Sequence, residues 1–345
     1  MYQPDIDQSI LKGVRFLHQH QMPNGEFCCY IGNEDSMKDT VPDNNIFPTS
    51  LICFSLLPLA HLDEVDEILQ LTASFLQYQS MRAGVWNNFT KAHKYFKICP
   101  ADVDNTACAS IVLKRLQREF TNNEQILLLN RNNKGLFYTW FTFRPNKVWN
   151  RDYWMLILRE LRFPLSSWIF WTKNEAGKYD IDGAVNANVL FYLGLKDSTR
   201  PIIKFIKDII LTNKENDCDK WYRNPFTIYY FFSRNYAAGL TELEAIKLPV
   251  TERILAKVQE NGAVGNGVLD TALAVISLIN LGYENNLVLR AAVNFIISKQ
   301  EKNGEWPRWA LYYGGPKKLQ CYGSEEATTG FCLEALALYQ KSLKI

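Results

Sequence analysis

The sequence contains no apolar run of the roughly 18 residues that a membrane-spanning helix needs. Its first residues, MYQPDIDQSILKG, are polar, so they do not provide the apolar core of a secretory signal peptide. These absences argue against a helical membrane protein and against secretion. We therefore expect a soluble protein of the cytoplasm, and peripheral contact with a membrane surface stays open.

Net charge is almost absent as well. The chain has 38 basic and 36 acidic residues, a formal net charge of +2, so no charge excess indicates nucleic acid as a partner. Histidines number only four, and His18 and His20 are two residues apart, so they would face different directions on a helix and bind a metal poorly. The eight cysteines include no CxxC pair, and several lie in apolar segments. This pattern favours buried, reduced thiols over disulfides.

Aromatic side chains, by contrast, are abundant. The 9 Trp, 17 Tyr and 20 Phe make up 13% of the chain, and they cluster in segments such as FYTWFTF, SSWIFW and EWPRWALYYGG. One interpretation is a large core with bulky side chains. The other is a cavity walled by aromatic faces, which stabilise cations. The candidates for such a wall are Trp140, Phe141, Trp168, Trp171, Tyr229, Tyr230, Trp306, Trp309, Tyr312 and Tyr313.

A short phrase recurs along the chain: an apolar helical segment, a polar residue, and then Gly-x-aromatic. Its copies are centred on Gly25, Gly84, Gly135, Gly177 and Gly304, with a weaker copy at Gly262. Each copy is followed at some distance by a second apolar segment with interspersed small residues, such as DNTACASIVLKRL or DTALAVISLINLGY. We expect the glycines at helix C-termini, because glycine tolerates the left-handed conformation found there.

Two helices per repeat and about six repeats predict an all-α chain of about twelve main helices. The small-residue segments should form an inner ring, and charged segments such as LDEVDEILQ should form an outer ring. The predicted fold is therefore a closed (α/α)6 barrel that makes a single domain of residues 1–345, with an open superhelix as the alternative. A barrel of this kind has a central cavity at the N-terminal ends of its inner helices.

The segment ICPADVDNTACASIVLKRL places acidic residues at the start of one predicted inner helix. Asp102, Asp104 and Asn105 fit two interpretations. Asp and Asn before an apolar helix are typical N-terminal caps. Two carboxylates close together in an apolar cavity can instead hold one proton between them and act as a general acid. Spacing alone leaves both interpretations open.

Two of these motifs resemble those of the triterpene cyclase family. Residues 300–306, QEKNGEW, match the QxxxGxW repeat of that family, and residues 21–27 are a near match with Phe in the last place. Residues 102–107, DVDNTA, are similar to the DxDDTA acid motif of squalene-hopene-type and other class II terpene cyclases. The resemblance in repeat architecture covers most of the chain, and protein prenyltransferase β-subunits share the same toroid.

The resemblance implies an enzyme that protonates an alkene or epoxide of an isoprenoid with an aspartic acid. Aromatic walls then guide the carbocation, and no metal takes part in the chemistry. Position by position, Asp104 matches the proton donor, Asp102 the first aspartate, and Asn105 the last position, where the commonest motif has Asp. An isolated Asp has a pKa of about 3.9 and is ionised at neutral pH. The donor would therefore need burial, which raises the pKa.

Size is the main departure from that family. Most class II cyclases enclose their substrate between two α-barrel domains, whereas this chain of 345 residues holds one barrel. Its own cavity could enclose a shorter substrate, a second chain or a second copy could complete the site, or the activity could be lost. For a prenyl diphosphate, Arg308 is the preferred phosphate partner and Mg²⁺ could take part. Further basic candidates are Lys91, Lys94, Lys97, Lys317 and Lys318.

Three other functions compete with cyclisation. A protein prenyltransferase would need a zinc site, but no cysteine follows Asp270 at the required spacing. A glycoside hydrolase on this scaffold could pair Asp104 with Glu325 or Glu326, although no motif supports either pair. A non-catalytic toroid would use the aromatic cavity to bind an isoprenoid or another hydrophobic ligand. The predicted partner of both the cyclase and the binding toroid is a small molecule, an isoprenoid in the first case and an isoprenoid or another hydrophobic ligand in the second.

Overall fold

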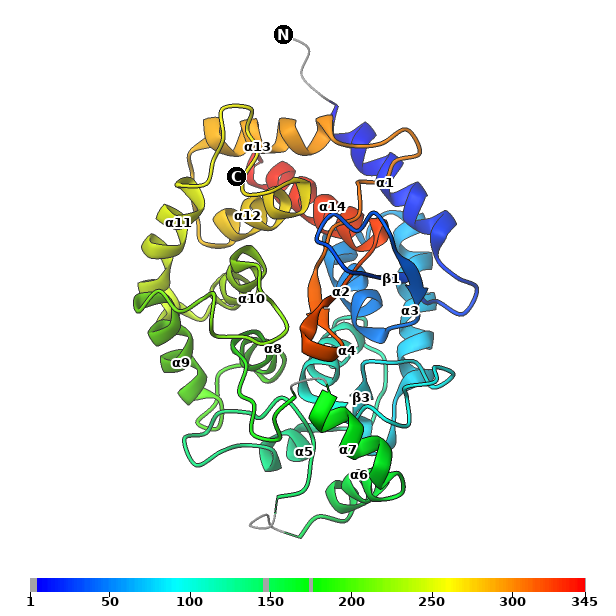
Figure 1. Cartoon of the computed structure of the whole chain (residues 1–345). Coiled ribbons are helices and arrows are strands. Elements are labelled where there is room, and N and C mark those ends of the chain that lie inside the picture. The colour runs from blue at the N-terminus through cyan, green and yellow to red at the C-terminus, as the bar shows by residue number, and fades with distance from the viewer. Residues whose placement is uncertain (1–4, 145–148, 174–175, 345) are drawn as a thin grey trace.

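The computed structural model describes residues 5–144, 149–173 and 176–344, and helices dominate these ranges. Six of the described helices form an inner ring (Figure 1). Each of them packs against the next, and the last packs against the first, so the ring closes. The inner helices are α2 (Ile46–Leu56), α4 (Val103–Arg115), α8 (Gly183–Leu193), α10 (Pro225–Ala237), α12 (Val268–Asn280) and α14 (Glu325–Ser342). The prediction of a mainly helical toroid is confirmed.

Other helices surround this ring (Figure 1). They are α1 (Ile6–His20), α3 (Asp63–Gln79), α5 (Glu124–Leu129), α9 (Arg200–Leu211), α11 (Lys247–Leu255) and α13 (Asn286–Ser298). Between α5 and α8 the chain forms two further helices, α6 (Arg151–Leu161) and α7 (Pro164–Lys173), which pack against each other. Short 3-10 helices occupy some connections, at η1 (Leu57–Leu59), η2 (Arg82–Gly84), η3 (Thr241–Ile246) and η4 (Pro316–Lys318).

Burial explains why some helices lie inside and others outside. The inner helix α12 is buried at every position from Val268 through Leu278, so all of its faces meet other parts of the protein. The outer helix α9 buries one side, with Ile206 and Ile209, while Lys204 on the other side is exposed. A helix that is apolar all round belongs in a core, and a helix with one apolar stripe belongs at a surface. As predicted, the apolar segments with small residues form the inner ring of helices, and the segments with a charged side form the outer ring.

The expectation of an all-α chain is corrected by six short strands among the described residues. A four-stranded sheet has the order β2-β1-β6-β5, and β3 pairs with β4. Strand β1 pairs antiparallel with β6, with Tyr30 opposite Gly323, so early and late parts of the chain are joined. The strands are too short to show alternation in the sequence. They are β1 (Cys29–Gly32), β2 (Val41–Asp43), β3 (Trp86–Asn87), β4 (Ala101–Asp102), β5 (Tyr312–Gly314) and β6 (Gln320–Gly323).

Five of the six recurring glycines have the predicted positive φ, with Gly177 as the exception, but Gly25 does not lie at the helix end where it was predicted. Helix α1 ends before Gln21, which is extended, whereas Gly25 lies in the following turn with a φ of 91°. A Cβ atom at Gly25 would lie 2.3 Å from the carbonyl oxygen of Leu71 in α3. A Cβ atom at Gly304 would lie 2.3 Å from the carbonyl oxygen of Lys12 in α1. Glycine is therefore required both by its positive φ and by the close approach of the neighbouring outer helix.

The eight cysteines are all free thiols, and six of them are buried. This agrees with the expectation of buried, reduced thiols. No helix in the described ranges combines the length and the apolar character that crossing a bilayer requires.

Candidate active site

A cavity of about 610 Å³ lies at the N-terminal ends of the inner helices α2, α4 and α8. This is the place at which the repeat pattern predicted a cavity. Its size is within the range of small-molecule sites, which runs from about 300 to about 1,000 Å³. Aromatic side chains make up much of its wall, namely Phe47, Phe89, Tyr95, Trp140, Phe170, Trp221, Tyr222, Tyr312, Tyr313 and Tyr322.

Asp102 is the N-terminal cap of α4. Its Oδ1 accepts a hydrogen bond of 2.7 Å from the backbone N–H of Asn105. The side-chain amide of Asn105 also donates to both carboxylate oxygens of Asp102, at 3.0 and 2.9 Å. The capping interpretation therefore holds for Asp102, because its carboxylate is engaged with the first turn of its own helix.

Asp104, two residues on, is held by other parts of the chain. Its Oδ1 accepts a hydrogen bond of 2.5 Å from Nδ2 of Asn188 in α8. Its Oδ2 accepts one of 2.6 Å from the hydroxyl of Tyr222 in the loop before α10. Asp104 is buried and lines the cavity. Tertiary packing, and not the start of the helix, therefore orients this carboxyl group.

Burial raises the pKa of both carboxyl groups. The pKa of Asp102 rises to about 8, because desolvation outweighs the hydrogen bonds from Asn105. The pKa of Asp104 is also raised, mainly by desolvation, while the hydrogen bonds from Tyr222 and Asn188 lower it. A buried acid of this kind can hold a proton at a pH where an exposed Asp is ionised. The donors beside Asp104 stabilise the anion that remains once the proton has left.

Arg234 in α10 holds the far end of the Asn188 side chain. Its Nη2 donates a hydrogen bond to Oδ1 of Asn188, so the N–H group of that amide is directed at Asp104. Arg234 is buried, and its guanidinium carbon lies 4.6 Å from the centre of the Phe191 ring. Its positive charge lowers the pKa of Asp104 and also that of Glu334, which burial raises to about 7. A buried cation therefore lies behind the candidate acid.

Asp219 positions two residues of the cavity wall. Its Oδ1 accepts hydrogen bonds from the backbone N–H groups of Trp221 and Tyr222, at 2.9 and 3.1 Å. Its Oδ2 accepts a bond of 3.0 Å from the backbone N–H of Ala184, in the first turn of α8. Burial, and then the nearby charge of Asp182, raises the pKa of Asp219. Asp219 thus joins the start of α8 to the loop that carries the Tyr222 hydroxyl.

Two groups of aromatic rings face the cavity. Trp140 makes edge-to-face contacts with Phe170 and Trp221, with ring centres 5.1 and 5.5 Å apart. Elsewhere on the wall, Tyr312 and Tyr322 stack with nearly parallel rings, 4.8 Å apart. Aromatic faces attract cations through their quadrupole. A cation formed inside this cavity would therefore meet a favourable surface.

The structure brings six of the predicted site residues together at the cavity. They are Asp102, Asp104, Asn105, Trp140, Tyr312 and Tyr313. Lys94 is the one predicted basic residue among those that line the described cavity. Lys173 lines it too, although it was not predicted.

Other predicted aromatic residues lie away from the cavity wall. Phe141 is buried in the main core, and Trp171 makes an edge-to-face contact with Trp140, with ring centres 6.1 Å apart. Trp168 is 60% exposed on α7. Trp309 is partly buried against the core. An aromatic cluster in the sequence marks burial in general, so it does not distinguish a cavity wall from packing between helices.

Three further predicted residues take part in packing between helices. The hydroxyl of Tyr229 donates to Oε1 of Glu215 at 2.8 Å, and that of Tyr230 donates to Oε2 of Glu334 at 3.2 Å. Trp306 is completely buried, and its indole N–H donates to the carbonyl oxygen of residue 296 at 2.7 Å. The tryptophan of the QxxxGxW match thus fixes the turn after α13 to that helix.

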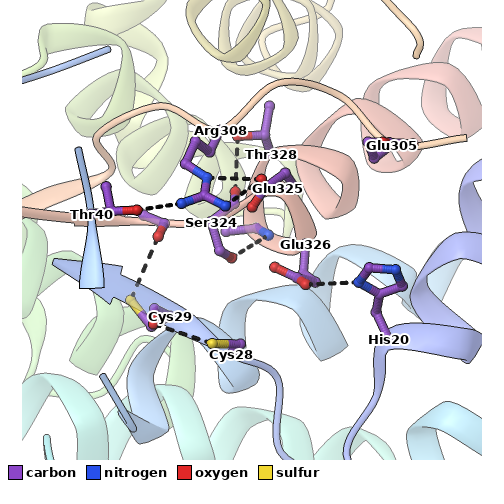
Figure 2. Close-up of polar contacts among 12 residues, drawn as sticks. His20, Cys28, Cys29, Thr40, Glu305, Arg308, Ser324, Glu325, Glu326 and Thr328 are labelled. Carbon is purple, nitrogen blue, oxygen red and sulfur yellow. Dashed lines mark hydrogen bonds and ion pairs between the residues drawn. The ribbon is translucent and has the colours of Figure 1, made fainter. Parts of the chain in front are cut away.

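Arg308 is bound by Glu325 and Thr40 (Figure 2), and it is not among the residues that line the described cavity. Its Nε and Nη2 donate to Oε1 of Glu325 at 2.8 and 2.5 Å, and its Nη1 donates to Oγ1 of Thr40. Its guanidinium carbon lies 3.8 Å from the centre of the Tyr30 ring. Arg308 therefore joins the first hairpin of the chain to the start of α14.

The remaining predicted lysines lie around the surface. Lys91 donates to the backbone carbonyl of Tyr78 at 2.5 Å, and Lys97 lies 6.0 Å from the ring centre of Phe163. Lys318 lies 5.4 Å from the ring centre of Trp221, and Lys317 is exposed in η4. None of these four is among the residues found to line the described cavity.

Of the residues considered for competing functions, Asp104 lines the cavity, whereas Asp270, Glu325 and Glu326 are not among its lining residues. Asp270 accepts hydrogen bonds from Asn224 and from a backbone N–H, at 2.5 and 2.8 Å. Glu325 pairs with Arg308, and Glu326 contacts His20 at 3.3 Å (Figure 2). Within the described ranges, no three His, Cys, Asp or Glu side chains are grouped as metal ligands would be.

Sequence analysis missed three residues around Asp104, namely Asn188, Tyr222 and Arg234. Arg234 left a signal, because it is a charged residue in the apolar run TIYYFFSRNY of a predicted inner helix. A charge at such a position needs a buried partner. Asn188 and Tyr222 left none, since one polar residue in a helix and one tyrosine in a loop are common in any protein.

No protein-family model matches this sequence, and no curated protein matches it by sequence. Solved structures do match the arrangement of its helices. Type II terpene cyclase MstE from Scytonema, in complex with its substrate geranylgeranyl dihydroxybenzoate, superposes with a TM-score of 0.69 at 15% identity, over 98% of each chain. This chain has the fold of the type II terpene cyclases.

Two further structures share that fold. A protein from Actinoplanes superposes with a TM-score of 0.68 at 16% identity, over 97% of this chain and 100% of its own. The ent-copalyl diphosphate synthase from Streptomyces platensis superposes with a TM-score of 0.55 at 19% identity, over 86% of this chain and 50% of its own. The type II cyclase fold thus occurs both at this chain length and as half of a longer enzyme.

Proposed function

We propose that this chain is a class II terpene cyclase-like enzyme, which starts the cyclisation of an isoprenoid by protonating a carbon–carbon double bond with Asp104. The observation that carries the proposal is the setting of that carboxyl group. Asp104 is buried with a raised pKa, and Asn188 and Tyr222 hold it on the wall of an aromatic cavity. The fold shared with type II terpene cyclases supports the same conclusion.

The proposed reaction begins when the electrons of a double bond take the proton of Asp104. A C–H bond forms, the O–H bond breaks, and a carboxylate and a carbocation result. The hydrogen bonds from Tyr222 and Asn188 strengthen as charge develops on the carboxylate, so they lower the energy of this step. Other double bonds then attack the cation, and loss of a proton at the end makes the product an isomer of the substrate.

Asp102 and Asn105 support the acid without donating the proton in this proposal. Together they cap α4, so they fix the backbone from which Asp104 projects. Aromatic faces such as those of Trp140 and Trp221 line the cavity and would stabilise the cation by about 0.5–2 kcal/mol each. The cavity wall would thereby favour cyclisation over capture by water.

The volume of the cavity supports a substrate of moderate length. Because one water molecule takes up roughly 30 Å³ in the liquid, the cavity of about 610 Å³ has room for on the order of 20 non-hydrogen atoms. This is about the size of an isoprenoid chain of farnesyl to geranylgeranyl length. MstE, whose length matches this chain, is a type II terpene cyclase with a geranylgeranyl substrate, which supports a one-barrel enzyme.

Several finer features belong to the same proposal. We infer six α/α repeats, each pairing one outer with one inner helix, within a single domain of residues 1–345. A diphosphate head group could bind near Lys94 and Lys173 at the cavity, and a role for Mg²⁺ in that case stays a prediction. A second copy that completes the site also stays a prediction.

The test is incubation of the purified chain with farnesyl and geranylgeranyl compounds and with squalene. The compounds should include the two prenyl diphosphates and geranylgeranyl dihydroxybenzoate. Cyclised isomers keep the mass of the substrate but change their retention and fragmentation in chromatography coupled to mass spectrometry. We expect isomers from at least one of the farnesyl or geranylgeranyl substrates.

The decisive variant is Asp104→Asn, which should reduce cyclisation by about 10²–10⁴-fold and leave the protein folded. Its matched control is Asp270→Asn, at a buried aspartate in the first turn of α12 that should leave the rate within threefold of wild type. Equal cyclisation by Asp104→Asn and wild type would show that another group donates the proton. Tight retention of an isoprenoid with no isomer formed would instead identify a binding protein.

A further inference from the structure

The cavity reaches only the first turn of the inner helices. The residues that line it from these helices are Phe47 in α2, Asp104 and Asn105 in α4, and Val185 in α8. Each of the four lies within the first three residues of its helix. Most of the length of the helical ring therefore lies deeper than the cavity, and side chains must close the lumen of the ring at this depth.

Two aromatic side chains meet across the lumen at that depth. Helix α2 packs against α4 and α14, and α10 packs against α8 and α12, so α2 and α10 face each other across the ring (Figure 1). The ring centre of Phe47 in α2 lies 6.0 Å from that of Tyr222, which is three residues before the start of α10. A contact between opposite sides of the ring crosses its lumen. We call the pair Phe47 and Tyr222 the cavity floor.

A second contact crosses the lumen below the cavity floor. The guanidinium carbon of Arg234 in α10 lies 5.1 Å from the ring centre of Phe54 in α2. Phe54 follows Phe47 by seven residues, which is about 10 Å along a helix. The ring of Phe231 joins the two levels, with its centre 5.2 Å from that of Tyr222 and 4.9 Å from the guanidinium carbon of Arg234. None of Phe54, Phe231 and Arg234 is among the residues that line the described cavity, so packed side chains fill the lumen below the floor.

The cavity floor lies at the depth of the candidate acid. The hydroxyl of Tyr222 donates to Oδ2 of Asp104 at 2.6 Å, and the ring of the same tyrosine contacts Phe47. A chain that enters the cavity and stops at the floor therefore brings its far end to Asp104. A longer chain cannot pass between the two rings of the floor. An isoprene unit that finds no room in the cavity stays in water and adds nothing to the affinity.

We propose that Phe47 determines the length of the isoprenoid chain that this cavity accepts. The inference rests on the proposed function for the isoprenoid nature of the ligand. Tyr222 shares the floor but also holds the candidate acid, whereas Phe47 has no polar group, so it can be replaced without removing a partner of Asp104. A smaller side chain in place of Phe47 extends the cavity toward Phe231 and lengthens the site. The contact of Arg234 with the opposite helix then becomes the new limit.

The first experiment compares chain lengths without turnover. Farnesol, geranylgeraniol and geranylfarnesol increase in length by one isoprene unit at each step, and equilibrium dialysis of the labelled alcohols gives their dissociation constants. All proteins carry Asp104→Asn, so that no ligand is consumed. With Phe47 in place, the step to geranylfarnesol should improve the affinity less than the step to geranylgeraniol. Phe47→Ala should raise the ratio of the affinities for geranylfarnesol and farnesol at least about tenfold, because more of the long chain leaves water.

The matched control is Phe89→Ala, which removes the same ring from another part of the wall. Phe89 follows β3 and contacts Tyr95, which is 43% exposed, so the control widens the cavity near its solvent side. Its affinity ratio should stay within twofold. An unchanged ratio in Phe47→Ala, an equal rise in Phe89→Ala, or no binding of any alcohol would overturn the proposal. Circular dichroism checks folding, and Phe47→Leu, which should act in the same direction by less, replaces Phe47→Ala if that protein does not fold.

The second experiment separates the role of Phe47 from the cyclase function. Proteins with Asp104 intact are incubated with farnesyl, geranylgeranyl and geranylfarnesyl diphosphates, and the isomers are counted by mass spectrometry. We expect Phe47→Ala to shift the distribution of isomers toward the longer compounds. Isomers from wild type with an unchanged affinity ratio in Phe47→Ala would refute the role of Phe47 and leave the cyclase in place. The expected change in the affinity ratio without any isomer would refute the cyclase and leave Phe47 as the limit of a binding site.

Discussion

The side-chain amide of Asn188 donates a hydrogen bond of 2.5 Å to Oδ1 of Asp104, and this contact joins two neighbouring inner helices at the candidate acid. The two residues are 84 positions apart in the sequence. Asp102, by contrast, is bound by Asn105, three residues away. Both aspartates of this short motif line the cavity, but Asp102 is bound within the first turn of its own helix, whereas Asp104 is bound by residues that are distant in the sequence.

Replacing Tyr222 by Phe tests the anion that proton transfer would leave. The change removes the donor to Oδ2 of Asp104 and keeps the ring that packs 5.2 Å from Phe231. Because this hydrogen bond lowers the pKa of Asp104, its loss makes the acid weaker and better protonated. We expect cyclisation to slow by about 10²-fold, while the loss of activity with rising pH moves to higher pH. Rates from product formation across the pH range would show both effects.

Replacing Arg234 by Met tests whether the cation behind Asn188 tunes the acid. Without the hydrogen bond to Oδ1 of Asn188 and the nearby charge, the pKa of Asp104 should rise. We expect a rate about tenfold lower and an alkaline limb displaced to higher pH. The control is Glu334→Gln, which alters another buried neighbour of Arg234 and leaves the Asn188 contact in place. Loss of stability with an unchanged pH profile would indicate that Arg234 only packs.

Replacing Asp102 by Asn tests the raised pKa of the cap. The pKa of Asp102 changes from an ordinary 3.8 to about 8 on folding, so between these values the native state holds a proton that the unfolded state has lost. The free energy of unfolding therefore falls as pH rises from about 4 to about 8. Asn cannot titrate and can still cap α4. We expect urea unfolding of the variant to depend less on pH across this window, and an unchanged slope would contradict the assignment.

Replacing Gly304 by Ala tests the contact between the outer helices. The new Cβ would lie 2.3 Å from the carbonyl oxygen of Lys12 at a φ of 106°, so it adds a clash to backbone strain. Gly239→Ala is the matched control, because Gly239 has a φ of 95° and open space around its Cβ position. We expect a loss of about 1 kcal/mol for the control and about 3 kcal/mol or more for Gly304→Ala. If urea unfolding showed the same loss in the free energy of unfolding for both variants, the clash with Lys12 would not contribute to the effect of Gly304→Ala.

The helical ring could be predicted because its signals are local and repeated. A buried inner helix must be apolar on every side and an outer helix on one side, and these patterns alternate along the chain. The strands could not be predicted, because pairs such as Tyr30 and Gly323 are formed by residues almost 300 positions apart. The pairing of β1 with β6 depends on the closure of the ring, and the locally paired strands are too short to leave a period in the sequence.

The candidate site was predictable only in part. The acid motif located Asp102 and Asp104 at the start of an inner helix, and Trp140, Tyr312 and Tyr313 do line the cavity beside them. Arg308, predicted as the partner of a substrate phosphate, instead pairs with Glu325. A charged side chain goes to the partner that lowers its free energy most, and that partner is not visible in the neighbouring sequence.

The sequence by itself determined which segments become helices, which of their faces are apolar, and where a carboxyl pair meets a helix start. These properties depend on residues within one or two turns of each other, so the chain carries them locally. Only the tertiary structure decided that Asn188 and Tyr222 contact Asp104. It also decided that Trp306 is buried between helices, whereas Trp140 lines the cavity. The physical reason is that the direction of a buried side chain depends on the neighbour supplied by another repeat, and closure of the ring chooses that neighbour.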